Sequence, residues 1–86
     1  AITLKEVPAR LAAFILNLAE DGRDRVELSI TKGQLASLLG ATPETISRAL
    51  ARLKSAGLIS EDKPYIIILD RDRLADASDG LSTEKH

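Results

Sequence analysis

The sequence contains no cysteine, no methionine and no tryptophan, and these absences narrow what the chain can do. Without cysteine there is no disulfide, thiolate nucleophile or cysteine-bound zinc. The single histidine, His86, is the last residue, so neither a catalytic histidine nor a histidine-bearing metal site is expected. No nucleophile–base pair, phosphate-binding glycine loop or metal-ligand cluster can be drawn from the residues that remain. We therefore predict that the chain is not an enzyme and that this domain needs no cofactor.

Aromatic residues are scarce as well, at 2% of 86 residues. Proteins that bind single-stranded nucleic acid stack bases on aromatic side chains, so that class is not expected. The apolar fraction of 44% still suffices for the core of one small domain, built from Leu, Ile, Val and Ala. No stretch of about 18 apolar residues appears, and no signal peptide is visible. We therefore expect a cytoplasmic domain without a membrane partner.

The charges are unevenly distributed along the chain. The net charge of −1 argues on average against a nucleic-acid binder. Residues 31–57, however, carry four positive charges and one negative charge, so their net +3 leaves −4 for the rest of the chain. A basic central segment between acidic flanks keeps a nucleic-acid partner open.

Hydrophobic periodicity and turn residues predict the order helix, strand, helix, helix, hairpin and short helix. The first helix covers 6–22, and its apolar residues at helical spacing are Leu11, Phe14, Ile15 and Leu18. An alternating strand covers 24–30. Apolar stretches on either side of 61–64 form a β-hairpin, and Asp70 caps a last helix over 71–78.

The second helix lies in the basic segment and has clear signals at both ends. Thr31 and Gln34 have the spacing of a capping box at its start. Gly40 ends it, because glycine readily adopts the positive φ of a helix-terminating turn. Its expected apolar stripe consists of Leu35, Leu38 and Leu39.

The third helix runs from the cap Thr42, with Pro43 at its first position, to about Ala56. Ala36, Gly40 and Ile46 then have the spacing of a helix-turn-helix, with a small residue at the crossing, a glycine in the turn and an apolar anchor in the core. With the hairpin as a wing, the predicted fold class is α+β, mainly α: a winged helix-turn-helix.

The third helix separates its apolar and polar residues by face. At about 100° per residue, Leu50 and Leu53 fall within about 40° of Ile46, whereas Glu44, Ser47 and Arg48 fall about 100–200° away. Arginine can bond bidentately to guanine, a carboxylate can accept from cytosine, and a small serine lets the helix approach closely. Glu44 and Arg48 are four residues apart, so each can orient the other. We predict that these three residues read bases, with an ordinary solvated helix face as the alternative.

Other polar residues on and around these helices are suited to the DNA backbone, because backbone contacts position a protein without specifying a sequence. The predicted backbone contacts are Lys32, Thr42, Thr45, Arg52, Lys54 and Lys63. For each cation, a solvated side chain is the alternative. The alternative for the whole chain is a winged-helix protein–protein interaction module without DNA binding, which the acidic flanks favour slightly.

The stretch ITKGQLASLLGATPETISRALARLKSAGLI resembles the DNA-binding domain of the Crp/Fnr family of bacterial transcription regulators. The motif residues are Ile30, Thr31, Ala36, Leu39, Gly40, Glu44, Thr45, Ile46, Ser47, Arg48, Gly57, Leu58 and Ile59. The resemblance extends through VPARLAAFILNLAE and YIIILDRDRL, to about Ser78. It implies a DNA-binding domain over 1–78, which leaves 79–86 as a polar tail that we expect to be disordered.

The resemblance also implies a function, namely sequence-specific binding of double-stranded DNA as the output domain of a Crp/Fnr-type regulator. Ser47 before Arg48 is similar to the Fnr-like branch, which favours half-sites containing TTGA. Pro43 stands where the catabolite-activator branch carries a further base-reading arginine, so the preference for the outer bases stays open. The chain starts at Ala1 and lacks Met, and we expect a piece of a longer protein without its sensor domain and dimerisation helix. The implied partners are duplex DNA, RNA polymerase and, in the full-length protein, a second copy; the isolated domain is expected to be monomeric.

Overall fold

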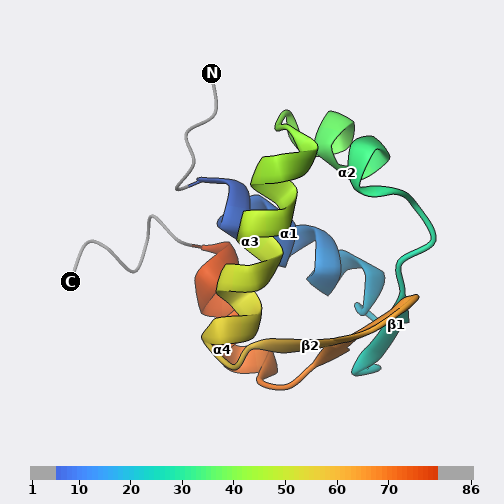
Figure 1. Ribbon diagram of the computed structural model, residues 1–86. Helices are drawn as coiled ribbons and strands as arrows, with labels where there is room; N and C mark the ends of the chain where they lie inside the picture. The colour runs from blue at the N-terminus through green and yellow to red at the C-terminus, as the bar shows by residue number, and fades with distance from the viewer. Residues whose placement is uncertain (1–5, 80–86) are drawn as a thin grey trace.

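The computed structural model describes residues 6–79, which form four helices and a three-stranded sheet (Figure 1). In chain order the elements are α1 (Glu6–Leu18), β1 (Arg25–Glu27), α2 (Lys32–Leu39), α3 (Pro43–Ser55), β2 (Ile59–Asp62), β3 (Tyr65–Ile68) and α4 (Arg71–Ser78). This arrangement confirms the predicted winged helix-turn-helix. Residues 1–5 of the predicted domain and 80–86 of the predicted tail lie outside the described residues. Asp79, the first residue of that tail, still caps α4, since its N–H donates to the carbonyl of Ala75.

The sheet is antiparallel with strand order β1-β3-β2, and the hairpin of β2 and β3 forms the wing. The expected strand over 24–30 is wrong in length, because β1 contains only three residues. Glu27 pairs with Tyr65, the first residue of β3, so the following residues have no strand beside them. The Leu28 N–H donates instead to the carbonyl of Pro64 at 2.8 Å, and the chain then turns toward α2.

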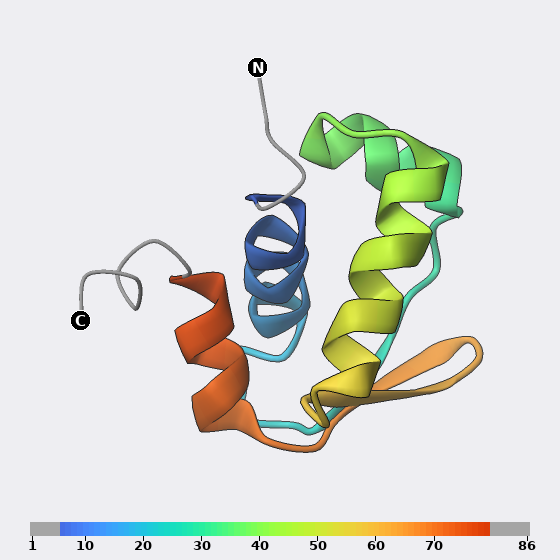
Figure 2. The same cartoon turned by 60° about the vertical axis from the view of Figure 1, so that its left-hand side comes forward.

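The core lies where α1 meets the other helices. Figure 2 shows α1 between α4 and α3, and α1 packs against both of them and against α2. Its buried residues include Leu11 and Ile15, as the periodicity predicts, while Phe14 is partly buried. Leu18 is 40% exposed at the end of α1, which stops four residues before the predicted Gly22.

The apolar stripe predicted for α2 is also partly wrong. Leu35 has no exposed surface and Leu39 is partly buried, but Leu38 is 65% exposed. On a helix of about 100° per residue, Leu35 and Leu39 lie about 40° apart on one side, whereas Leu38 lies about 100° from Leu39. Because α2 packs mainly against α3, only the first side is covered.

Two contacts from α4 and β1 complete the frame around α3 and the wing. Asp70 caps α4 by accepting from the Arg73 N–H at 3.1 Å, as predicted. The Arg73 guanidinium donates to the carbonyl of Ala56 at 3.1 Å, so α4 satisfies one of the carbonyls left open at the end of α3. In the sheet, the guanidinium of Arg25 lies 4.0 Å from the centroid of the Tyr65 ring, a cation–π contact that joins β1 to the wing. Within residues 6–79 no helix is long and apolar enough to cross a membrane.

Candidate nucleic-acid interface

The turn between α2 and α3 is built from local hydrogen bonds that the sequence signals predict. Thr31 accepts from the Gln34 N–H at 3.0 Å, and Gln34 accepts from the Thr31 N–H at 2.9 Å, which completes the capping box. Gly40 has φ of +71°, a left-handed conformation that residues with a Cβ rarely adopt. The Ala41 N–H then returns to the carbonyl of Ala36 at 2.8 Å. The capping box fixes the start of α2, and the left-handed Gly40 with the Ala41–Ala36 bond sets the angle at which α3 leaves α2.

The core-facing side of α3 confirms the predicted anchor. Ile46 has no exposed surface, and Leu50 and Leu53 are 2% and 3% exposed. The buried stripe also includes Ala49, so one side of the helix is held by apolar packing along its length. Because this side is fixed, the opposite side is fixed in direction as well.

The opposite side of α3 presents the three predicted base-reading residues, Glu44, Ser47 and Arg48, and all three are exposed. Ala51 is exposed between them and the end of the helix. The spacing of Glu44 and Arg48 would let each orient the other, but the two form no ion pair or hydrogen bond with each other or with any other residue in the 6–79 range. Both side chains therefore present unused hydrogen-bonding groups to the solvent.

A small hollow borders this face on the side of α1. Its volume is about 150 Å³, and its lining residues are Pro8, Thr45, Arg48, Ala49 and Arg52. Two guanidinium groups from successive turns of α3 therefore flank the start of α1. Of the predicted backbone contacts, Arg52 and Thr45 lie on this side.

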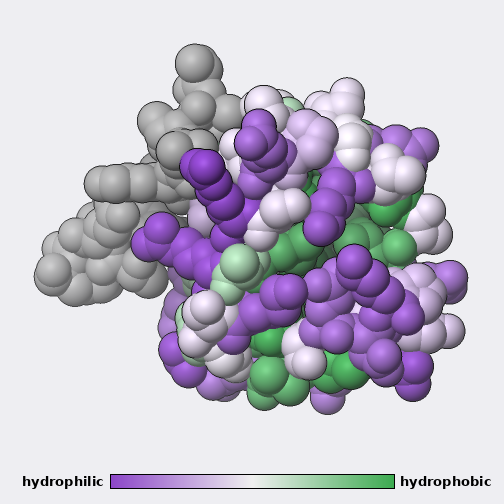
Figure 3. Space-filling view, viewed as in Figure 1, coloured by the Kyte–Doolittle hydropathy of each residue, from purple (hydrophilic) through white to green (hydrophobic). Residues whose placement is uncertain are grey.

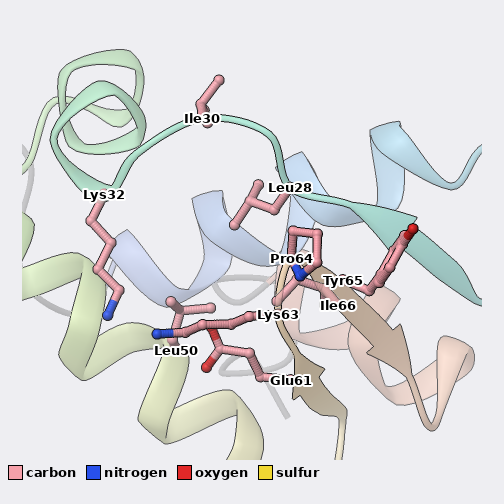
Figure 4. Close-up of a pocket in the computed structure, with 9 residues that line it drawn as sticks. All are labelled: Leu28, Ile30, Lys32, Leu50, Glu61, Lys63, Pro64, Tyr65 and Ile66. Atoms are coloured by element: carbon pink, nitrogen blue, oxygen red, sulfur yellow. The ribbon is translucent and has the colours of Figure 1, made fainter.

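A larger hollow of about 440 Å³ borders the same face on the side of the wing. Its apolar lining includes Leu28, Ile30, Leu50 and Ile66, and its charged lining consists of Lys32, Lys63 and Glu61. Figure 3 shows hydrophobic surface between hydrophilic side chains on this side of the molecule. In Figure 4, Lys32 from the start of α2 and Lys63 from the wing turn both extend toward α3. The cations predicted to contact the DNA backbone thus lie on the two flanks of α3.

Among the charged residues that line this hollow, Glu61 of β2 is the one to which the sequence assigns no role. Its Oε1 lies 2.9 Å from the Lys54 Nζ, with side chains that are 16% and 41% exposed respectively. The pKa of Glu61 lies below its ordinary value, first because Lys54 donates a hydrogen bond to it and then because Lys63 and Lys32 add positive charge nearby. No sequence signal marks this contact, because Lys54 and Glu61 lie on different elements.

The two predicted threonine contacts have roles within the helix start. The Thr42 Oγ1 accepts from the Thr45 N–H at 3.2 Å and lies 2.9 Å from the Thr45 Oγ1. Thr42 therefore caps α3, as predicted. A hydroxyl oxygen has two lone pairs and one donor, so both residues retain hydrogen-bonding capacity toward solvent.

The acidic residues of α4 lie away from the exposed face of α3. Asp72 and Asp76 belong to α4, and α1 stands between α4 and α3 (Figure 2). The fold therefore separates the net +3 of residues 31–57 from part of the negative charge that lowers the chain average. In the part of the chain that the structure describes, no three acidic or histidine side chains are grouped so as to hold a metal ion.

Comparison with known proteins assigns this arrangement to a family. Residues 9–77 match the family described as the Crp-like helix-turn-helix domain. Electron transport regulator A of Shewanella oneidensis is 42% identical over 79 residues, which are 85% of this chain and 32% of that protein. The Fumarate and nitrate reduction regulatory protein of Escherichia coli is 38% identical over 80 residues, 86% of this chain and 32% of that protein. The crystal structure of DNR from Pseudomonas aeruginosa has a TM-score of 0.73 and 40% identity, covering 83% of this chain and 33% of that one.

This chain therefore spans about a third of the length of these relatives. They are named as regulators, not as enzymes, and the Escherichia coli relative agrees with the Fnr-like branch that Ser47 and Arg48 indicate. The two helices α2 and α3 and the left-handed turn at Gly40 between them are the parts that the family's name describes. The chain belongs to the Crp/Fnr family of transcription regulators and corresponds to the family's DNA-binding output domain, the Crp-like helix-turn-helix domain.

Proposed function

We propose that the exposed face of α3 enters the major groove of duplex DNA, with Glu44, Ser47 and Arg48 on base edges. The observation that carries the proposal is the position of these side chains. They are exposed and have no partner among residues 6–79, on a helix whose other side is buried in the core. The major groove is about 12 Å wide and accepts a helix of about 10–12 Å diameter. The small side chains of Ser47 and Ala51 allow a close approach.

The flanks of α3 support backbone contacts on both sides of that groove. We propose that Arg52 and Thr45, which line the hollow beside α1, contact one phosphate strand. Lys32, Lys54 and Lys63, on the wing side, would contact the other strand, with Thr42 at the start of the helix. This division is what a helix in a groove requires, because the two backbones run along its two sides. We propose that these groups suffice for binding DNA and that the domain needs no cofactor.

The target that we propose is a half-site of the TTGA type, by the resemblance to the Fnr-like branch. Its single G·C pair offers a guanine that suits Arg48 and a cytosine that suits Glu44. Pro43 lacks a side chain that reads base edges, so we expect weak discrimination at the outer bases. We propose cytoplasmic location and RNA polymerase as a partner for the longer regulator of which this domain would form about a third, by its relatives' length.

Competition binding with Arg48→Ala and Arg52→Ala tests the proposal. Arg48→Ala should cost about 1–3 kcal/mol on the TTGA duplex and relax the preference at one base pair. Arg52→Ala is the matched control for a backbone contact, and it should weaken specific and random duplexes alike and reduce the salt slope by about 1. Equal losses for Arg48→Ala on every duplex would make it a phosphate contact. Failure of the unaltered domain to bind any duplex at low salt would favour the protein–protein module.

The same titrations address the oligomeric state that we propose. Regulators with this domain read two half-sites as dimers, about one helical turn apart. A linked second module adds about 10²–10⁴ in avidity. We propose that the isolated domain is a monomer and gains little from a palindrome over a half-site. A stable dimer in sedimentation, with tight binding of the palindrome, would contradict this.

A further inference from the structure

The three lysines on the wing side of α3 surround a single carboxylate. Lys32 begins α2, Lys54 lies in the last turn of α3, and Lys63 lies between β2 and β3. Glu61 of β2 lies among them, bonded to Lys54 at 2.9 Å, and its side chain is only 16% exposed. In Figure 4 the carboxylate of Glu61 lies beneath the stem of Lys63, on the side of the hollow that faces α3.

The position of Glu61 follows from the pleat of β2. Successive residues of a strand point to opposite faces, so Glu61 shares a face with the buried Ile59. That face is turned toward α3, against which β2 packs. Asp62, the next residue, is exposed, and its side chain forms no hydrogen bond or ion pair with any residue in the described range.

A carboxylate oxygen and a phosphate oxygen are the same kind of acceptor for a lysine ammonium. All three lysines are proposed backbone contacts, so Glu61 and a bound duplex compete for the same donors. Since the pKa of Glu61 is lowered by these lysines, its negative charge is present at neutral pH. The cluster then offers DNA a net charge of about +2 in place of +3.

We propose that Glu61 is an electrostatic restraint on DNA binding, whose carboxylate competes with backbone phosphate for Lys54 and so lowers affinity for every duplex without changing base preference. The inference rests on the proposed function, because it concerns the backbone contacts of that same interface. Its effect is equal on specific and random DNA, since both present the same phosphates.

The size of the effect follows from counterion release. Each phosphate neutralised contributes about 0.9 to the slope of log affinity against log salt. If the variant frees Lys54 completely from the carboxylate, one more phosphate is neutralised, and the affinity at 0.1 M salt rises about 8-fold when the affinities at 1 M salt are taken as equal. If Lys54 is freed by half, the affinity rises about 3-fold. Glu61→Gln should accordingly bind both duplexes about 3- to 8-fold more tightly, with a salt slope steeper by about 0.5–0.9.

Fluorescence anisotropy with a TTGA duplex and a random duplex of equal length, titrated at several salt concentrations, measures both quantities. The matched control is Asp62→Asn, which removes the same charge at the next residue. The Asp62 side chain bonds no lysine in the part of the chain that the structure describes. Its gain should be smaller and its slope nearly unchanged. A Lys54→Gln background provides a second control, in which the gain from Glu61→Gln should fall by at least half. Far-UV circular dichroism establishes that each variant is folded.

Two results would overturn the inference. A gain for Glu61→Gln no larger than that for Asp62→Asn would mean that only overall charge matters. A loss of affinity would mean that Glu61 positions Lys54 for phosphate and assists binding. If the unaltered domain binds neither duplex, the proposed function fails and this inference falls with it; if it binds and Glu61→Gln behaves like its control, only the inference fails.

Discussion

The two leucines Leu35 and Leu38 of α2 test the packing of the helix-turn-helix most directly. Both occur in the same helix of eight residues, and both match the apolar pattern expected of its buried side. Leu35 has no exposed surface, whereas Leu38 is 65% exposed. The variants Leu35→Ala and Leu38→Ala therefore make the same chemical change in two environments, with nearly equal helix propensity for the old and new residue.

Truncation of a buried leucine removes its transfer free energy and leaves a cavity, which together cost about 2–5 kcal/mol. A domain of this size is expected to have an unfolding free energy of about 4–13 kcal/mol, at about 0.05–0.15 kcal/mol per residue. Leu35→Ala should thus remove a large share of the stability and lower Tm by at least about 8 °C, at about 4 °C or more per kcal/mol. Leu38→Ala should stay within about 0.5 kcal/mol, or about 4 °C.

Urea unfolding followed by far-UV circular dichroism gives the two free energies, provided that the slope with denaturant is equal among the variants. Leu38→Ala serves as the internal control for Leu35→Ala. A loss above about 1.5 kcal/mol for Leu38→Ala would refute the reasoning, because it would require that the outer side of α2 is covered in the folded domain.

Two further predictions concern the acids at the interface. Glu44→Ala should change base preference more than total affinity, and binding to random DNA should stay level or become slightly stronger because an acid near phosphate is removed. Competition binding measures both effects. A uniform loss of affinity together with reduced helicity would assign Glu44 to stabilising the start of α3. Glu61 faces Lys54 of α3, Lys32 of α2 and Lys63 of the wing turn, and its pKa is lowered. Its ionised form therefore stabilises the fold above the ordinary pKa of about 4.5, and that stabilisation is lost as the pH falls through the lower folded pKa. Glu61→Gln should therefore be less stable than the unaltered domain at pH 7, and this difference should shrink as the pH is lowered below the ordinary pKa of 4.5. Urea midpoints measured across this acid range would show the decrease, whereas a difference independent of pH would contradict the assignment.

The elements that sequence reasoning located correctly are those held by local interactions. The caps Thr31, Thr42 and Asp70 each bond within three residues along the chain, so their signals can be read without knowledge of the fold. The buried stripe of α3 follows from the period of the helix alone. The motif from Ile30 to Ile59 was sufficient to identify the family, and the comparisons confirm that family.

The errors occur where a residue's surroundings come from a distant part of the chain. β1 is short because its partner β3 begins at Tyr65, almost forty residues later. Leu38 is exposed because α2 packs mainly against one other helix. Glu44 and Arg48 differ from these cases, because they are close in the chain and their spacing only permits an ion pair, from which exposed side chains gain little.

By itself, the sequence determined the helices and their caps, the helix-turn-helix spacing, the family and the residues that the third helix can offer to DNA. These properties depend on neighbours within one or two helical turns, where backbone geometry is the same in any fold. Only the tertiary structure decided which apolar residues are covered, how the acids of α4 are separated from α3, and that Glu61 lies against Lys54 among the proposed phosphate contacts. Burial and charge pairing of a residue depend on every element that packs around it. Which elements pack together is set by the arrangement of α1, α3 and the wing, and not by any single segment.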